Sequence, residues 1–204
     1  MLRGMVFSDQ LNFDIAVQHY YKDIQEAPPR LDYDVLFKNI SLQVKNVDFL
    51  KAFIFYPKPD KNLMEDAYEL NKYNWISGMQ NSSFLDIIES SYIARPKNDE
   101  IPIDINDKST YYKVEKGTDI NMSIHALTKA FYNSYDVGFF ISADTDYIPI
   151  YQTLKNLGKL VVVVYIKDQQ IHKIKPHVDK HVILDKDFFD KCLRHEKHKG
   201  KGLM

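Results

Sequence analysis

The stretch Val137-Gly-Phe-Phe-Ile-Ser-Ala-Asp-Thr-Asp-Tyr147 joins an apolar run of strand length to two aspartates that are one residue apart. An apolar run without polar alternation is typical of a strand buried on both faces inside a parallel sheet. Asp144 and Asp146 then lie at the carboxyl end of this strand, the edge where open α/β sheets bind ligands. Two close carboxylates repel each other unless a cation or a proton intervenes, so a divalent metal is the first hypothesis for this edge.

Strands and helices alternate on both sides of this stretch. Strands are expected at residues 4–7, 47–56, 92–95, 137–141, 160–166 and 182–184, and a hairpin is expected from 101–105 and 111–115. Helices are expected over 13–24, 33–44, 119–131, 147–157 and 188–193, and as two helices within 62–91, the second beginning near Ser82 or Ser83. This alternation predicts an α/β fold, a three-layer αβα sandwich with a mainly parallel central sheet.

Length and composition favour one domain in a reducing compartment. The chain has 204 residues, which suits a single domain over 1–193 followed by a basic tail over 194–204. Cys192 is the single cysteine and no eighteen apolar residues run together, so we expect a cytoplasmic protein without a membrane span. A net charge of -1 argues against a surface coated with basic residues for duplex binding. A nucleic-acid substrate therefore requires a local basic patch.

Two further aspartates are expected at the same edge of the sheet. Asp9 and then Asn12 follow the first strand, and Asp119 stands in the first turn of the helix over 119–131. With Asp144 and Asp146 these acids make a set of four hard oxygen donors, which Mg²⁺ and Mn²⁺ prefer. Such ions activate a water and stabilise a leaving oxygen in phosphodiester hydrolysis.

Three motifs in this order resemble the NYN domain, including its LabA-like bacterial members, within the PIN-like nuclease superfamily. Residues 6–12, Val-Phe-Ser-Asp-Gln-Leu-Asn, are similar to the opening strand of the family, with an Asp and an Asn three residues later. Lys116-Gly-Thr-Asp119 resembles a Lys-Gly-x-Asp helix start, and Ser142-Ala-Asp-Thr-Asp-Tyr147 resembles a Ser-x-Asp-x-Asp-hydrophobic block. The resemblance is strongest over residues 111–166 and covers most of the chain in outline.

The resemblance implies a PIN-like fold and an RNA phosphodiesterase. It implies catalytic and metal-binding roles for Asp9, Asp119, Asp144 and Asp146, with Asn12 and Ser142 as polar supports near the substrate. Three positions depart from the family pattern: Gln10 and Ala143 replace glycines, and His125 replaces a residue that is often acidic. The two missing glycines are expected to restrict how closely the backbone approaches a substrate.

Each of these residues also has an ordinary structural explanation. Asp119 and Asp146 stand at helix starts, where capping alone explains an aspartate, whereas Asp9 and Asp144 follow strands and fit capping less well. Glu115 is a candidate fifth ligand, but the end of a hairpin more often exposes a glutamate.

The remaining candidates are assigned in the same way. We interpret His125 as structural or as a support for the ligands, and Cys192 as a core thiol. Packing explains the aromatic residues Tyr68, Tyr73 and Trp75 better than base stacking does. Arg95 and Lys116 are expected to contact phosphates of the substrate, and Lys97 is equally compatible with a solvated surface position.

Three hypotheses follow. The first is a cytoplasmic nuclease that cleaves single-stranded or structured RNA with Mg²⁺ or Mn²⁺. The alternative is a catalytically weak or inactive RNA-binding or protein-interaction module on the same fold. A third interprets Asp144-Thr-Asp146 as the nucleotide-sugar motif of a glycosyltransferase, which needs no acid at Asp9 or Asp119. The sequence leaves both a monomer and a homo-oligomer open.

Overall fold

The computed structural model describes residues 1–82 and 84–194. Seven strands lie in this part of the chain: β1 (Leu2–Asp9), β2 (Val47–Pro59), β3 (Leu85–Pro96), β4 (Tyr111–Lys116), β5 (Val137–Ile141), β6 (Leu160–Ile166) and β7 (Lys180–Leu184). Six α-helices accompany them: α1 (Gln10–Asp23), α2 (Tyr33–Ser41), α3 (Ala67–Gly78), α4 (Thr118–Phe131), α5 (Ile148–Asn156) and α6 (Lys186–Asp190). Ser83 and all but the first residue of the predicted tail lie outside the described residues.

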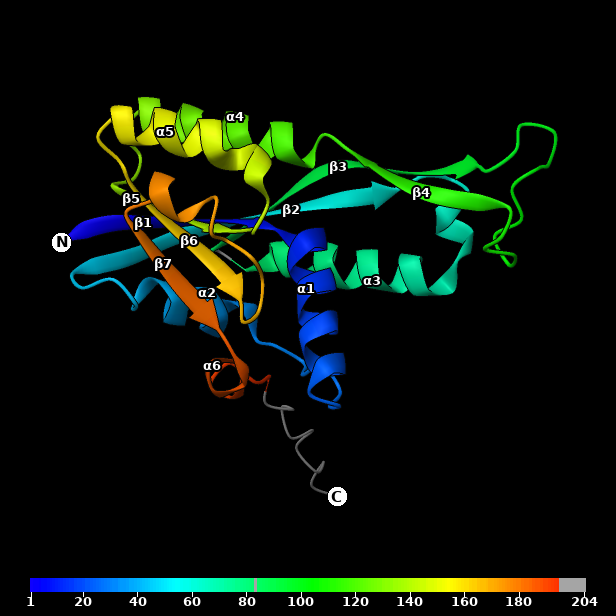
Figure 1. The fold of residues 1–204 in the computed structure, drawn as a ribbon, viewed down its shortest axis with the longest axis horizontal. Helices are drawn as coiled ribbons and strands as arrows, with labels where there is room; N and C mark the ends of the chain where they lie inside the picture. The colour runs from blue at the N-terminus through cyan, green and yellow to red at the C-terminus, as the bar shows by residue number, and fades with distance from the viewer. Residues whose placement is uncertain (83, 195–204) are drawn as a thin grey trace, which may run out of the picture.

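The strands form one mostly parallel sheet, as the sequence predicts. Its order is β4-β3-β2-β1-β5-β6-β7, and only β3 and β4 pair antiparallel. The sheet is strongly twisted, and β3 and β4 extend beyond the rest of the molecule as a two-stranded arm (Figure 1). The central strands β1 and β5 lie side by side, which brings the ends of two predicted site segments together.

Hydrophobic residues on the two faces of the sheet form two separate cores. Val6, Ile54 and Phe139 pack with residues of α1, α2, α3 and α6, whereas Phe7, Phe53 and Phe140 pack with residues of α4 and α5. Alternate residues of a strand face opposite sides, so each central strand contributes to both cores. In Figure 1, α4 and α5 accordingly lie above the sheet, and α1, α2, α3 and α6 lie below it.

The predicted second helix within 62–91 is wrong. The first half forms α3 as expected, but residues 85–96 form the long strand β3, which pairs parallel with β2. Leu85 and Ile87 pack on the α3 side of the sheet, and Ile88 packs on the α4 side. An apolar run that is buried on both faces has no strict alternation, and its spacing then resembles that of a helix.

The predicted hairpin of 101–105 with 111–115 is also wrong. The partner of β4 is β3, with Arg95 opposite Tyr112 and Ser91 opposite Lys116. Residues 101–105 form no strand and belong to the loop at the tip of the arm. Ile103 and Ile105 pack there against a small cluster of Leu63, Ala94 and Tyr111, which accounts for their alternation in the sequence.

No helix in the described part of the chain has both the length and the apolar character that crossing a membrane requires.

The register of the central strands positions the site. Ser8 of β1 lies opposite Ile141 of β5, so Asp9 and Ser142 leave the sheet at the same edge.

Candidate functional site

Asp9 is the most enclosed of the four predicted ligands. It ends β1 and caps α1, because its Oδ1 accepts a hydrogen bond from the backbone N–H of Asn12 at 3.1 Å. Its Oδ2 accepts a hydrogen bond from the hydroxyl of Tyr147 at 3.1 Å. Burial, together with the charges of Glu115 and Asp144, raises the pKa of Asp9 to about 6. The two hydrogen bonds oppose this increase. Asp9 therefore lies in a partly desolvated, negatively charged environment.

Asp144 and Asp146 follow β5 in a tight turn that is exposed to solvent. Asp144 Oδ1 accepts a hydrogen bond from the backbone N–H of Asp146 at 2.9 Å and so caps the short 3-10 helix Thr145–Tyr147. The backbone N–H of Asp144 in turn donates to the Oγ of Ser142 at 3.2 Å. The buried Ser142 therefore shapes the turn, and one oxygen of Asp144 remains available to a ligand.

The capping roles are the reverse of those expected from the sequence. Asp9 and Asp144, which follow strands, both cap helices. Asp119 is exposed in the first turn of α4, where the N-cap residue is Gly117 with a φ of +92°. Helix capping by Asp119 and Asp146 is thus wrong as their explanation, because other side chains accept from the free N–H groups: Asp144 from that of Asp146, and Glu115 from that of Thr118.

Glu115 lies closer to the site than the sequence suggests. Its Oε1 accepts a hydrogen bond from the backbone N–H of Thr118 at 2.8 Å, which holds the start of α4. Glu115 is half-buried, and its charge raises the pKa of Asp9. The expected hairpin-end surface position is therefore wrong, because β4 leads directly into α4 beside the end of β1.

The acids at this edge suit a hard divalent cation in charge and donor type. Glu115 and Asp144 both repel the ionised form of Asp9, and a cation relieves this repulsion. Among residues 1–82 and 84–194, however, no group of three or more His, Cys, Asp or Glu side chains is arranged to hold a metal ion. The residues thus fit an ion that keeps several waters, as Mg²⁺ commonly does, better than one held directly by several carboxylates.

The predicted substrate-contacting residues do not all lie beside these acids. Asn12 is half-buried one turn into α1, next to Asp9, and Lys116 is exposed at the end of β4, three residues before Asp119. Arg95 lies near the far end of β3, opposite Tyr112 on the arm, and not at the carboxylate edge. The sequence misplaces Arg95 because β3 begins seven residues earlier than the predicted strand.

A family model described as "NYN domain" matches residues 5–185. The chain belongs to the NYN domain family. This family is part of the PIN-like nuclease superfamily and generally comprises nucleases. A crystal structure of a protein of unknown function from Vibrio parahaemolyticus RIMD 2210633 has a similar fold, with a TM-score of 0.55 and 14% identity over 92% of this chain and 95% of that chain. Comparison with curated proteins finds no match.

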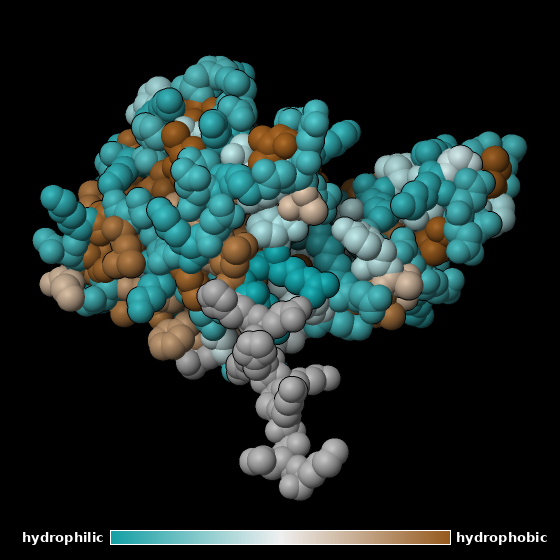
Figure 2. All heavy atoms as spheres, turned by 90° about the horizontal axis from the view of Figure 1, so that it is seen from below, coloured by the Kyte–Doolittle hydropathy of each residue, from teal (hydrophilic) through white to brown (hydrophobic). Residues whose placement is uncertain are grey.

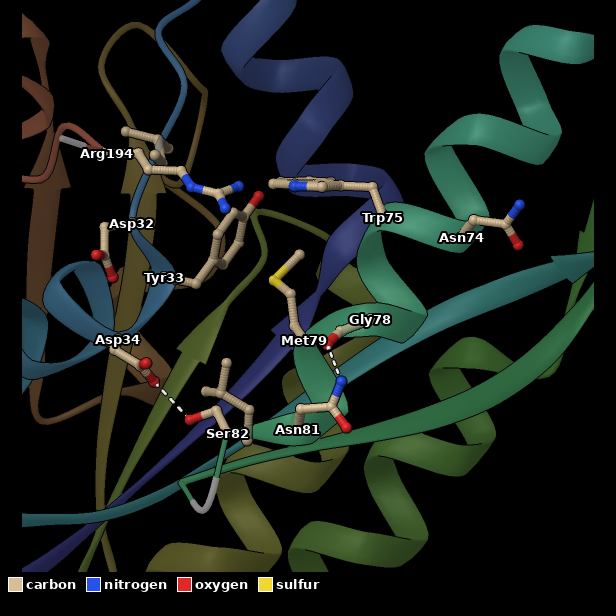
Figure 3. A pocket seen from close by; sticks show the side chains of 12 residues that line it. Asp32, Tyr33, Asp34, Asn74, Trp75, Gly78, Met79, Asn81, Ser82 and Arg194 are labelled. Atoms are coloured by element: carbon tan, nitrogen blue, oxygen red, sulfur yellow. Dashed lines mark hydrogen bonds between the residues drawn. The ribbon is translucent and has the colours of Figure 1, made fainter. Parts of the chain in front are cut away.

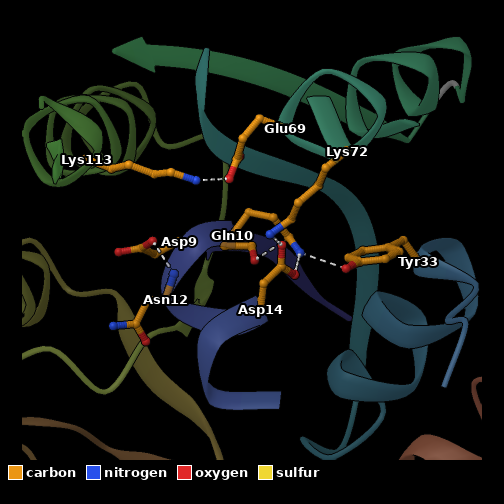
Figure 4. A network of polar contacts seen from close by, with 9 residues as sticks. Asp9, Gln10, Asn12, Asp14, Tyr33, Glu69, Lys72 and Lys113 are labelled. Atoms are coloured by element: carbon orange, nitrogen blue, oxygen red, sulfur yellow. Dashed lines mark hydrogen bonds and ion pairs between the residues drawn. The ribbon is translucent and has the colours of Figure 1, made fainter. Parts of the chain in front are cut away.

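Gln10, the first departure from the NYN pattern, points away from the carboxylate edge. It is fully buried, and its Nε2 donates to Asp14 Oδ1 at 2.6 Å and to the hydroxyl of Tyr33 at 2.7 Å. Asp14 forms an ion pair with Lys72 of α3 at 2.9 Å. Figure 4 shows this network beside Asp9 and Asn12, with a second ion pair, Glu69 to Lys113, linking α3 to β4. Gln10 thus fastens α1 to α2 and α3.

The other two departures are also structural in this NYN domain. Neither Gln10 nor Ala143 has a positive φ, so neither position requires glycine. Ala143 is half-buried against the core beneath α4 and α5. The ring of His125 packs edge-on against Phe55 with 5.6 Å between ring centroids, and burial, then the charge of Lys129, lowers its pKa. This packing supports the structural interpretation of His125.

A separate hollow lies between α2 and α3, away from the four aspartates (Figure 3). Trp75 lines it, is 41% exposed, and packs edge-on against Tyr33 with 5.6 Å between ring centroids. Ser82 on its rim donates to Asp34 Oδ1 at 2.9 Å. The hollow mixes acidic residues with Arg194, so its charge does not favour an anionic ligand. Trp75 combines the packing expected from the sequence with partial exposure.

Tyr147 is the site residue that sequence reasoning misses. It is 1% exposed, and a buried tyrosine hydroxyl normally has a hydrogen-bond partner. Its position directly after Asp146, at the start of the helix over 147–157, is the available signal. A tyrosine there can reach back to the end of a neighbouring strand, and its partner is Asp9.

Proposed function

We propose that this chain is a metal-dependent ribonuclease that hydrolyses RNA phosphodiester bonds at the edge formed by Asp9, Asp119, Asp144 and Asp146. One observation carries the proposal: Asp9 is partly buried at the end of β1 beside other acids, and this burial, together with the charges of Glu115 and Asp144, raises its pKa to about 6. Perturbed carboxylates at the carboxyl end of parallel strands are typical of functional sites. Membership of a family that generally comprises nucleases gives this site its reaction class.

The chain supplies ligands and substrate contacts in this proposal. Asp9 and Asp144 would hold Mg²⁺ or Mn²⁺, and Asp119, Asp146 and Glu115 would add negative charge beside it. The ion, when bound, acts as a Lewis acid and lowers the pKa of a bound water. Lys116 neutralises a phosphate, Asn12 and Ser142 position the ligands, and Tyr147 orients the carboxylate of Asp9.

Further features are proposed with this activity. They are a three-layer, PIN-like αβα architecture in one domain over 1–193, a LabA-like position within the NYN family, and a cytoplasmic location. The free, buried thiol of Cys192 is compatible with a reducing compartment.

Cleavage assays with purified protein test the activity. Labelled single-stranded and hairpin RNAs are incubated with Mg²⁺, with Mn²⁺ or with EDTA. We expect metal-dependent cleavage by the wild type and a loss of at least about a hundredfold in Asp144→Asn, because the substitution removes the charge of a proposed metal ligand. Asp48→Asn is the matched control, since Asp48 is exposed on β2 opposite Arg3 near the start of β1, far from the site. A folded wild type that is inert with both metals on all RNAs contradicts the proposal.

The second candidate is an RNA-binding or protein-interaction module without cleavage. It is favoured by the absence, among the described residues, of three acids arranged to hold a metal. RNA binding that persists in EDTA and in Asp144→Asn, together with no cleavage, supports this alternative. The match to the NYN family favours both candidates over a glycosyltransferase.

A further inference from the structure

The two-stranded arm of β3 and β4 has one packed face and one exposed face. Cross-strand partners in a sheet project to the same side, and alternate residues along a strand share that side. Tyr92, Ala94 and Tyr111 face the small cluster around Leu63. The opposite face carries Ser91, Ile93, Arg95, Tyr112, Val114 and Lys116. We call these six residues the outer arm face.

The outer arm face combines cations with an accessible aromatic ring. Arg95 and Lys116 are exposed, and the ring of Tyr112 is 51% exposed directly opposite Arg95. The face contains no acidic residue. Within the described residues, neither Arg95 nor Lys116 forms an ion pair. Lys58 of β2, which lies opposite Ser91, pairs with Glu89, and Lys113 pairs with Glu69 on the packed face. Free cations beside an exposed ring are the elements that bind single-stranded nucleic acid.

Charged residues lie at both ends of the outer arm face. Lys116 at its inner end lies three residues before Asp119, whereas its neighbour Glu115 pairs with Tyr92 and projects to the opposite, packed face. The loop at its outer end carries four acids and two lysines: Asp99, Glu100, Asp104, Asp107, Lys97 and Lys108. From Tyr112 to Lys116 the strand covers about 13 Å, enough for a short run of nucleotides. In Figure 1, β4 runs from the tip of the arm to the start of α4, the helix that carries Asp119, and in Figure 2 the surface of the arm is mostly hydrophilic.

We propose that the outer arm face binds single-stranded RNA and guides it to the carboxylate edge, an inference whose guiding role rests on the proposed nuclease function. Tyr112 stacks on an unpaired base, and Arg95 and Lys116 contact phosphates on either side of it. Arg95 is remote from the acids, and this position then suits a contact with a part of the RNA away from the bond that is cleaved. An isolated ring on a narrow arm can stack only on a base that is not already paired, which selects single strands over duplexes.

Equilibrium binding in EDTA tests the surface without requiring cleavage. The probe is a fluorescein-labelled 20-nucleotide oligo(U), and fluorescence anisotropy gives its affinity. We expect Tyr112→Ala to bind about tenfold more weakly and Tyr112→Phe to bind like the wild type, because stacking needs the ring and not the hydroxyl. Tyr68→Ala is the matched control, since Tyr68 is 60% exposed on α3. Circular dichroism confirms that each variant is folded.

The salt dependence of binding tests the two cations. For single strands, the slope of log K against log salt falls by about 0.7 for each lost phosphate contact, so Arg95→Ala/Lys116→Ala is expected to lower it by about 1.4. Lys22→Ala/Lys38→Ala is the control, because both lysines are exposed on α1 and α2, outside the arm. A duplex RNA of the same length is expected to bind more weakly than oligo(U).

The outcomes separate this inference from the proposed nuclease. Metal-dependent cleavage, combined with unchanged affinity and salt slope in the arm variants, overturns the inference and leaves the nuclease standing. Oligo(U) binding that depends on Tyr112 and the two cations, combined with no cleavage by the wild type, supports the arm and overturns the nuclease. A wild type that binds no RNA, or that prefers the duplex, overturns the inference.

Discussion

The hydroxyl of Tyr147 donates a hydrogen bond to Asp9 Oδ2 at 3.1 Å, across 138 residues of chain. The bond joins the turn after β5 to the end of β1, two strands that are neighbours in the sheet. Tyr147 is buried, so its hydroxyl has a fixed direction. It therefore orients one oxygen of the carboxylate that burial has brought to a pKa of about 6.

Tyr147→Phe removes this hydrogen bond and keeps the ring. The bond lowers the pKa of Asp9, so we expect this pKa to rise above about 6 in the variant. The free energy of unfolding at pH 7 is expected to fall by about 1–3 kcal/mol, the usual contribution of a hydrogen bond to a charged group. NMR titration of the Asp9 carboxyl carbon and urea unfolding measure the two effects. Tyr132→Phe, at a position that is 74% exposed, is expected to change neither.

Asp9→Asn changes how stability depends on pH. Burial raises the pKa of Asp9 from its usual 3.8 to about 6 in the folded state, so the folded state binds more protons than the unfolded state between these pH values. Stability from this residue is complete below about pH 4 and is lost as pH rises through about 6. Asparagine caps a helix as well as aspartate does and stays neutral. We therefore expect Asp9→Asn to be more stable than the wild type at pH 7, by up to about 3 kcal/mol.

Urea unfolding of the wild type, Asp9→Asn and Asp48→Asn at pH 4, 5, 6 and 7 measures this difference. The advantage of Asp9→Asn is expected to disappear near pH 4, and Asp48→Asn is expected to follow the wild type throughout. If Asp9→Asn is the less stable protein at pH 7, the desolvation of Asp9 is not the dominant effect.

Much of this fold is predictable because its central strands have simple patterns. The runs over 137–141 and 160–166 are fully apolar, and such runs have few alternatives to an inner strand. The strand β3 is harder to predict, since Ile87 and Ile88 face different cores and their spacing also suits a helix. The tip loop resembles a strand in the sequence because Ile103 and Ile105 alternate for packing, but the backbone around Asp104 makes turn hydrogen bonds.

The candidate site is predictable in outline and not in detail. The positions of Asp9 and Asp144 at strand ends are predictable, because each follows an apolar run. The contacts of Tyr147 and Glu115 depend on which strands are neighbours, and sheet order is a long-range property that local spacing does not encode. The predicted position of Arg95 at the carboxylate edge is wrong for the same reason. Its distance from the acids depends on where β3 begins and how far it runs.

Glu115→Gln separates the charge of Glu115 from its hydrogen bond. The amide oxygen of glutamine can still accept from the N–H of Thr118, so the start of α4 is expected to be preserved. The negative charge that raises the pKa of Asp9 is lost, so this pKa is expected to fall below about 6. NMR titration of Asp9 and amide exchange at Thr118 measure the two. Glu115→Ala is expected to lose both, at a further cost of about 1 kcal/mol in stability.

Gln10→Gly restores the residue usual in the family and is expected to destabilise this chain. Gln10 is fully buried, accepts from the Ser8 hydroxyl at 3.3 Å and donates to both Asp14 and Tyr33. Its removal leaves the hydroxyls of Ser8 and Tyr33 without this partner, leaves Asp14 with Lys72 alone, and opens a cavity, which together cost about 2–4 kcal/mol. Gln18→Gly, at an exposed position of α1, is expected to cost only the helix propensity, about 1 kcal/mol.

Thermal and urea unfolding of the two variants separate the loss of the Gln10 hydrogen bonds from the destabilising effect of glycine on the helix backbone. Because Gln10 points toward Asp14 and Tyr33, RNA cleavage well below the melting temperature is expected to stay near the wild-type rate (Figure 4). Equal destabilisation by Gln10→Gly and Gln18→Gly contradicts the structural role. A large gain in cleavage by Gln10→Gly instead indicates that the glutamine restricts access to the carboxylate edge, as the sequence comparison with the family first suggests.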